Sequence, residues 1–479
     1  MNLRNQVIHG LSWSFIARFG SQLCQLVVSI TLARMLTPNE FGIIGMLLVF
    51  TGFAQSFSDF GLGSALIYYQ NVTEVHRSSA FWLQLGVGVF LTVLFYVLAP
   101  FIADFYSLPI LTRLARLLSC VFFFQAVGQT HSALFAKEFR FKALAISNVG
   151  AATGSGIIAV IVAHAGYGVW ALAWQPVVSA VTLAFLLSLQ SPWRPRLMFN
   201  WAAASELWRY GSYLMGHGSL NYWLRNGDNL LIGKVLGAHA LGVYARAYSL
   251  MLLPLTNIGS AVGQVMFPAL SQLQNDVAKF RYQYLAATRG IALVSFPLMA
   301  GVAALARPLI LFLLGDKWAE VVPILQILSL VGLFQSIIFP VGWIFTALGK
   351  TKAQFHLSIV LGIAFAAAMF MGIQHGVLGV TYAYAAWTLL SGLLNLRLVG
   401  LYIKTSVTAM LLAVAPIAVL AGVMGFFVYS CDATIFAAWP LAARLAIGLA
   451  LGVASFFTLC AVTKDETFQQ LSQLIYERL

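Results

Sequence analysis

Charged residues are scarce in this chain. They make up 9% of its 479 residues, whereas hydrophobic residues make up 61%, and the mean hydropathy is +0.88. A soluble globular chain carries about a quarter charged residues. So small a charged fraction cannot solvate the surface of a soluble protein of this size. The composition therefore excludes that class and predicts a protein embedded in lipid.

Acidic residues are rarer than basic residues. The chain has 14 Asp and Glu against 27 Lys and Arg, which gives a net charge of +13. The basic residues occur singly in connecting loops and form no patch with interleaved aromatic residues, so we expect no nucleic-acid partner. In a membrane protein such an excess is typical of cytoplasmic loops and of attraction for an anionic lipid or substrate.

Cysteine is rare as well. Four cysteines lie far apart, without CxxC spacing and mostly within apolar runs: Cys24, Cys120, Cys431 and Cys460. We interpret them as inert buried thiols rather than disulfide partners or metal ligands.

Motifs of catalysis and of ATP-driven transport are missing. The segment 347–351 (ALGKT) ends like a phosphate-binding loop, but the leading glycine of GxxxxGK[ST] falls on Ile344. There is no HExxH motif, and the loops are too short for an inserted catalytic domain. We therefore predict a protein that is neither an enzyme nor, by itself, an ATP-driven pump, and that needs no metal or organic cofactor.

Apolar runs of about 20 residues, long enough to cross the hydrocarbon core, fill the chain. We expect an all-α integral membrane protein with about 14 transmembrane helices. The expected helices cover residues 8–33, 41–67, 79–102, 111–134, 142–163, 167–190, 207–233, 241–268, 284–305, 322–346, 353–373, 376–398, 405–429 and 439–462. The first is expected to be a transmembrane helix and not a removed signal peptide, because no cleavage site follows it. Prolines inside the runs predict kinks, at Pro176, Pro254, Pro297, Pro340 and Pro416.

Lys and Arg residues are distributed unequally between the two sides. When the loops are assigned to alternate sides, one side collects twice as many as the other. The positive-inside rule then places both termini and the linker 191–206 in the cytoplasm.

The two halves of the sequence resemble each other. LARMLTPNEFGIIG (32–45) matches IGKVLGAHALGVYA (232–245), with Leu36 and Gly42 aligned to Leu236 and Gly242. Two further matches follow in the same order: 139–143 with 349–353, and 164–174 with 375–385. An even number of helices per repeat implies the same topology in both halves, as in some secondary transporters. We expect lobes at 1–190 and 207–404, two further helices within 405–463, and a cytoplasmic tail at 464–479 whose end forms a short amphipathic helix.

Several charges lie inside apolar runs, where each costs roughly 2.5–3.5 kcal/mol at the bilayer centre. Helical spacing places many of them in polar stripes. The residues expected to face a central cavity are Arg18, Gln22, Gln25, Tyr210, Tyr213, His217, Asn221, Arg225, Asp228 and Arg246. Alternatives remain open, because Arg225 and Asp228 can neutralise each other and His217 can be an ordinary interior histidine. Residues considered for ion coupling are Asp59, Asp228 and Arg289, although Asp59 and Arg289 lie close enough to helix ends to snorkel.

Several segments resemble one known family, the Wzx-type polysaccharide transporters of the MOP superfamily, and most of all its colanic acid exporter branch. They are SDFGLGSALIY (58–68), FWLQLGVG (81–88), KEFRFKA (137–143), NGDNLLIGKVLGAHALGVYARAYSLMLLP (226–254), FPALSQLQND (267–276) and LGDKWAEVVPILQILSLVGLFQSI (314–337). The resemblance covers essentially the whole chain. It implies two six-helix lobes around a central cavity, with two extra helices.

The resemblance also implies a function. The substrate would be an undecaprenyl-diphosphate-linked oligosaccharide, moved across the bacterial inner membrane by alternating access and driven by an H⁺ or Na⁺ gradient. The partners would be membrane lipids and the polymerase and chain-length regulator of the same pathway. A drug antiporter of the MATE type is the alternative, and a membrane glycan polymerase or ligase is a weaker one. A MATE exporter needs an acidic cavity and usually 12 helices, and the enzymes carry a long periplasmic loop, so both fit this sequence less well.

Overall fold

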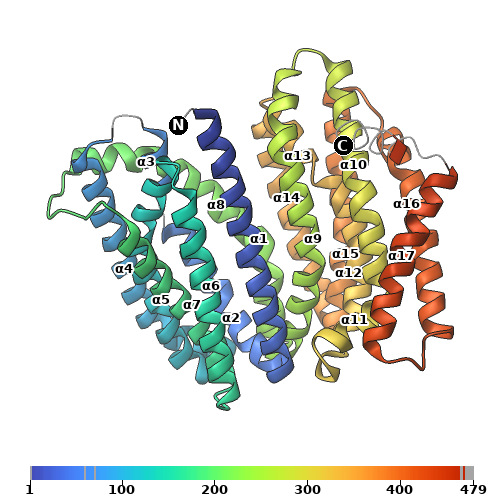
Figure 1. Ribbon diagram of the computed structural model, residues 1–479, viewed down its shortest axis with the longest axis horizontal. Coiled ribbons are helices and arrows are strands. Elements are labelled where there is room, and N and C mark those ends of the chain that lie inside the picture. The colour runs from blue at the N-terminus through green and yellow to red at the C-terminus, as the bar shows by residue number, and fades with distance from the viewer. Residues whose placement is uncertain (1–2, 59–60, 70–71, 464–467, 470–479) are drawn as a thin grey trace. The chain divides into compact units, whose positions relative to one another are not determined.

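A computed structural model describes residues 3–58, 61–69, 72–463 and 468–469, without the side chains of 3–12, 14–16, 56, 209–221, 224–225 and 351. All regular structure in these ranges is helical (Figure 1). The helices of the first half are α1 (Leu3–Met35), α2 (Pro38–Ser58), α3 (Leu62–Tyr68), α4 (Glu74–Tyr106), α5 (Ile110–Lys137), α6 (Phe141–His164), α7 (Val169–Gln190) and α8 (Trp201–Val235). Those of the second half are α9 (Gly237–Gln272), α10 (Val277–Ala304), α11 (Ala306–Leu313), η1 (Asp316–Trp318), α12 (Val321–Ile338), α13 (Val341–Ala347), α14 (Thr351–Gly372), η2 (Ile373–His375), α15 (Gly376–Ile403), α16 (Val407–Thr434) and α17 (Leu441–Thr463).

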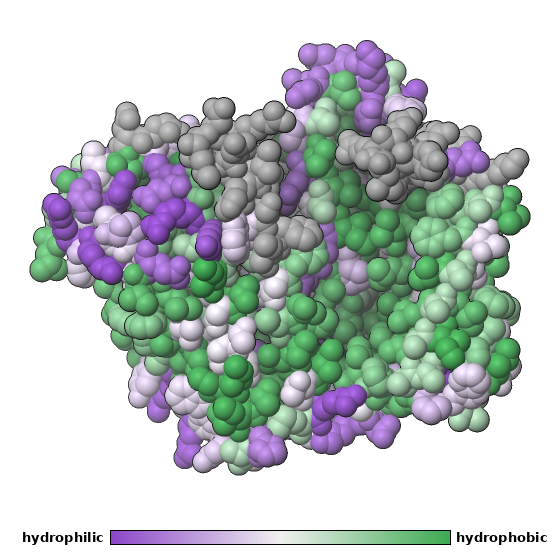
Figure 2. Space-filling model, in the orientation of Figure 1, coloured by the Kyte–Doolittle hydropathy of each residue, from purple (hydrophilic) through white to green (hydrophobic). Residues whose placement is uncertain are grey.

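The helices carry apolar side chains on surfaces that no other part of the chain covers. Figure 2 shows hydrophobic residues along the middle of the helices in view and hydrophilic ones gathered near their ends. Phe101, Phe185 and Phe426 are 65%, 64% and 75% exposed. Within the described residues, ten helical segments are long and apolar enough to cross a membrane. The protein is therefore a multi-pass membrane protein; the count of about 14 crossings stays a prediction.

Several expected boundaries differ from the structure. The run 41–67 divides into α2 and α3, with Gly61 at φ 66° ahead of α3. The run 322–346 divides at Pro340, which cannot donate the backbone hydrogen bond that would continue α12. Helix α8 starts at Trp201, so the segment outside helices is 191–200. Asn200 caps α8, its side chain accepting a hydrogen bond of 3.2 Å from the Ala203 amide.

The chain forms two compact units, Met1–Gly242 and Val243–Leu479. In the first unit, α4, α5, α7 and α6 pack in that order and α1 packs on α6 (Figure 1), while α8 contacts α2, α3 and α4. In the second unit, α10 packs against α12 and α16, and α15 against α12 and α14. The two C-terminal helices α16 and α17 pack against each other there. The expected lobes at 1–190 and 207–404 rest on the sequence repeat and stay a prediction.

The expected C-terminal amphipathic helix lies largely outside the described residues. Phe468, which is described, packs against an apolar cluster of the second unit, and its ring centroid lies 5.8 Å from that of Phe457.

Two glycines that the sequence repeat aligns take part in one close helix contact. A Cβ placed on Gly42 in α2 would lie 1.6 Å from the Ala238 carbonyl oxygen, and one on Gly242 would lie 1.9 Å from the Pro38 carbonyl oxygen. The repeat offset of 200 aligns residue 38 with 238 and residue 42 with 242. Gly42 therefore meets the counterpart of Pro38, and the counterpart of Gly42 meets Pro38 itself. Such a reciprocal contact is the pattern of a two-fold interface. It lies within the first unit and agrees with the repeat offset found in the sequence.

Gly42→Ala is expected to lower the free energy of unfolding by at least about 1–3 kcal/mol, the usual cost of overpacking. The added methyl group would meet a backbone carbonyl, which cannot rotate away as a side chain can. Gly242→Ala is expected to behave alike. Thermal unfolding of the purified protein in detergent measures the effect. The control is Gly86→Ala, where an added Cβ meets nothing within 4 Å; equal stability of Gly42→Ala and this control would contradict the close contact.

Candidate functional site

The polar stripe of α1 faces away from the helix on which α1 packs. The contact with α6 runs along Gly20, Cys24 and Val28: Cys24 Sγ lies 3.5 Å from Thr153 Oγ1, and a Cβ on Gly156 would lie 2.2 Å from Val28 Cγ2. At 3.6 residues per turn, the polar stripe then lies roughly a third of a turn away from this contact. The stripe consists of Arg18, Gln22 and Gln25, of which the first and last are exposed and Gln22 is half-buried.

The rest of the uncovered surface of α1 is apolar. Phe19, Leu23 and Val27 are 47%, 63% and 56% exposed and follow one another at helical spacing. The surface of α1 is thus divided into a strip suited to lipid and a strip carrying a guanidinium and two amides. A guanidinium in contact with hydrocarbon is costly, so the polar strip is suited to water or to a polar ligand.

The stripe predicted on α8 falls mostly outside the described residues. This applies to the side chains of Tyr210, Tyr213, His217, Asn221 and Arg225, and to all of Asp59. The described member, Asp228, is 2% exposed, and its Oδ1 accepts a hydrogen bond of 2.8 Å from the Asn229 amide. Whether Asp228 pairs with Arg225 therefore stays open.

Two further candidates lie in packed regions of the second unit. The guanidinium carbon of Arg246 on α9 lies 5.4 Å from the ring centroid of Trp318, which is fully buried in η1; this is a cation–π contact. Arg289 on α10 donates a hydrogen bond of 3.1 Å from Nε to the Ala413 carbonyl of α16. In this structure both arginines contribute to packing, and their roles in binding and ion coupling stay predictions.

One buried ion pair was not anticipated from the sequence. Arg444 near the start of α17 donates from Nε and Nη2 to the two carboxylate oxygens of Asp432 near the end of α16, at 2.8 and 2.7 Å. The side chains are 13% and 8% exposed. The pair joins the ends of two consecutive membrane helices. The sequence held a signal for this pair, because Asp432 lies in the gap between the last two apolar runs and Arg444 lies near the start of the second run.

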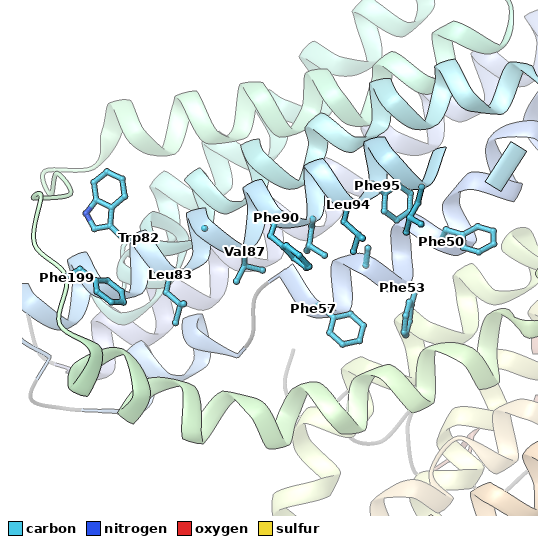
Figure 3. Close-up of a pocket in the computed structure, with 14 residues that line it drawn as sticks. Phe50, Phe53, Phe57, Trp82, Leu83, Val87, Phe90, Leu94, Phe95 and Phe199 are labelled. Carbon is cyan, nitrogen blue, oxygen red and sulfur yellow. The ribbon is translucent and has the colours of Figure 1, made fainter. Parts of the chain in front are cut away.

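An apolar cavity of about 640 Å³ lies in the first unit, between α2 and α4. Figure 3 shows Trp82, Leu83 and Phe199 at one end, and Phe50, Phe53 and Phe95 at the other. The described residues that line it all present carbon, apart from the Trp82 ring nitrogen, which donates to the Arg196 carbonyl at 2.8 Å. In the sequence, the helical spacing of Phe50, Phe53 and Phe57 indicates that they share one face of α2, and this face forms a wall of the cavity.

The segment 191–200 is held against α4 at the Trp82 end of the cavity. Trp193 Nε1 donates to Glu74 Oε1 at 2.8 Å, and the Asn200 amide donates to Ser79 Oγ at 2.9 Å. Arg196 Nε lies 4.0 Å from the same Glu74 oxygen, and the arginine side chain is 70% exposed. The end of α4 thus carries a fixed segment with basic side chains.

Comparison with solved structures shows which fold the chain has. The chain is similar to the lipid II flippase MurJ in an inward closed conformation, with a TM-score of 0.75 over 96% of this chain and 100% of that one, at 15% sequence identity. At that identity the likeness shows the fold alone.

The family follows from the sequence. Residues 31–323 match a family described as polysaccharide biosynthesis protein, and the chain belongs to it. It is 28% identical to the teichuronic acid biosynthesis protein TuaB of Bacillus subtilis (strain 168), over 98% of both chains. It is also 28% identical to the lipopolysaccharide biosynthesis protein WzxC of Escherichia coli (strain K12), over 82% of this chain and 81% of that one. The predicted Wzx-type transporter of the MOP superfamily is therefore confirmed, and the protein is a polysaccharide-biosynthesis transporter rather than an enzyme.

Proposed function

We propose that this protein is a flippase of the bacterial inner membrane that moves an undecaprenyl-diphosphate-linked oligosaccharide from the cytoplasmic to the periplasmic leaflet. Family membership and fold support a transporter of polysaccharide biosynthesis. The observation that carries the choice of substrate is the polar face of α1, because it presents a cation beside two amides and is turned away from the packing surface of its own unit.

The chemistry of that face matches the head group. A diphosphate is recognised by charge-assisted hydrogen bonds, for which the planar guanidinium of Arg18 is suited. Sugar hydroxyls are both donors and acceptors, and the amides of Gln22 and Gln25 offer both functions. On α8 we assign sugar and diphosphate contacts to Tyr210, Tyr213, His217, Asn221 and Arg225.

The transport step in this proposal is alternating access between two six-helix lobes. A gradient of H⁺ or Na⁺ supplies the energy. The buried carboxylate of Asp228 is the preferred coupling group, since ionisable residues inside membrane proteins often serve ion pathways. The pathway partners are the polymerase and the chain-length regulator.

The orientation proposed is cytoplasmic for both termini and for 191–206, in line with the excess of Lys and Arg on that side. A reporter enzyme fused to the C-terminus checks it, because a periplasmic signal would contradict both the orientation and an even number of crossings.

Depletion of the protein from its native cells is expected to reduce polymer export more than tenfold and to trap lipid-linked oligosaccharide in the cytoplasmic leaflet. In spheroplasts the trapped sugar should resist a membrane-impermeant oxidant, whereas in wild-type cells part of it should react. Accumulation of reactive, outward-facing oligosaccharide would instead identify a polymerase or ligase. Unchanged export with altered drug sensitivity would favour a MATE-type antiporter.

A further inference from the structure

The apolar cavity of the first unit has the size of a chain-binding site. At about 30 Å³ per water-sized group, its volume of about 640 Å³ accommodates about 20 carbon atoms, which is roughly four isoprene units. Along α4 the lining runs from Leu83 to Leu98, which at 1.5 Å per residue corresponds to a length of about 22 Å. The cavity is therefore long enough for a hydrocarbon chain lying along the helix.

Aromatic contacts fix two of the side chains that line the cavity. The ring centroid of Phe53 lies 4.9 Å from those of Phe57 and Trp223, and Phe95 lies 5.2 Å from Phe122 in α5. Because Trp223 and Phe122, which do not line the cavity, pack against Phe53 and Phe95, the space does not close by a simple change of side-chain rotamer. Phe90 in its lining is 63% exposed, so the cavity is open on one side.

One end of the cavity is cationic. Trp82 lines this end and is bonded to the backbone of Arg196, whose side chain is 70% exposed. Arg194 lies two residues away, fixed by a hydrogen bond of 2.8 Å from Nη1 to the Ser191 carbonyl. Glu74 is the acidic group that faces Arg196, at 4.0 Å. An apolar channel with exposed cations at one end is complementary to a lipid with a long chain and an anionic head.

Resting on the proposed function, we propose that this cavity binds the isoprenoid chain of the lipid carrier at a first site, with the carrier phosphate at the Arg194–Arg196 end before the head group moves to the polar face of α1. The cavity takes about four isoprene units, which are those next to the phosphate, and the rest of the carrier chain stays in lipid. The site holds the carrier beside α8, which passes along the cavity and contacts both α2 and α4 (Figure 3). It thereby assigns a binding role to α2 and α4, helices outside the polar stripes.

Gly86→Leu tests the cavity directly. Gly86 lines it, and a Cβ there meets nothing within 4 Å, so the new side chain fills the space without displacing the fold. The matched control is Gly422→Leu on α16, where an added Cβ also meets nothing within 4 Å. Binding of undecaprenyl phosphate to the purified full-length protein, measured by native mass spectrometry, is expected to weaken at least tenfold in Gly86→Leu and to stay unchanged in Gly422→Leu. Arg196→Gln should weaken binding of undecaprenyl phosphate but not of uncharged undecaprenol.

Other outcomes overturn the inference. Unchanged binding of undecaprenyl phosphate by Gly86→Leu would show that the chain lies elsewhere. Equal binding of phosphatidylglycerol with the same dependence on Gly86 would make the cavity a general lipid site and overturn the choice of carrier. The proposed function is tested separately, by depletion. If polymer export survives depletion of the protein, the proposed function is wrong, whether or not binding of the carrier depends on Gly86.

Discussion

Arg18→Ala is expected to reduce polymer export at least tenfold while the amount of protein in the membrane stays near that of the wild type. Hydrogen bonds to charged groups contribute about 1.5–3 kcal/mol each, and losing one from the transport cycle corresponds to roughly a 10- to 150-fold loss. The fold should tolerate the change because α1 is held to its unit by a different face, through Gly20, Cys24 and Val28. Arg18→Lys should restore part of the export, since it keeps the charge but loses the planar pair of donors.

The control for Arg18 lies on the neighbouring apolar strip of the same helix. Leu23 is 63% exposed, so Leu23→Ala removes side-chain volume from α1 without removing charge and should leave export unchanged. Export of the native polymer is measured per unit of membrane protein. If Arg18→Ala fails to accumulate in the membrane, the residue stabilises the fold, and the polar face of α1 loses its place in the substrate proposal.

Asp432→Ala is expected to lower the free energy of unfolding by about 3–5 kcal/mol, the usual cost of removing one partner from a buried pair. The guanidinium of Arg444 would lose both of its carboxylate acceptors in a site where it is only 13% exposed. Arg444→Ala should be similarly damaging. Removing both charges should be milder than removing either, because no uncompensated charge then remains.

Thermal unfolding of the purified protein in detergent measures these stabilities, and membrane protein level reports them in cells. The control is the exposed pair of Asp276 and Lys279, whose charged atoms lie 3.2 Å apart; Lys279→Ala should change stability little, since water solvates the carboxylate left behind. Additive losses in the Asp432→Ala/Arg444→Ala double variant would show that the two residues act independently, contrary to the bidentate geometry.

Hydropathy was sufficient to predict the helices, because in lipid every backbone group must be satisfied within its own helix. The break at Pro340 was expected only as a kink, since proline in a membrane helix bends or ends it depending on what packs nearby. The start of α8 at Trp201 depends on a single capping side chain, that of Asn200, which a hydropathy window does not detect.

Residues that are distant in sequence account for what could not be predicted. Arg18 and Arg246 both belong to polar stripes, yet Arg246 lies against Trp318, 72 positions away, and no periodicity reveals that partner. The cavity between α2 and α4 depends on which helices become neighbours, and hydropathy treats its aromatic residues as ordinary lipid-facing ones. The buried pair of Asp432 and Arg444 required the turn between α16 and α17 to bring the two charges together.

The glycine contact between α2 and α9 has an evolutionary consequence. In a half-length ancestor that assembled as a homodimer, Gly42 and Gly242 would have been one codon, and a single mutation there would have altered both sides of the contact at once. Gene fusion removes that constraint. Two separate codons must then each keep a glycine, because a Cβ at either position would meet the backbone carbonyl of Ala238 or Pro38. This contact is therefore a place where the two halves of the chain are held to the same residue after the rest has diverged.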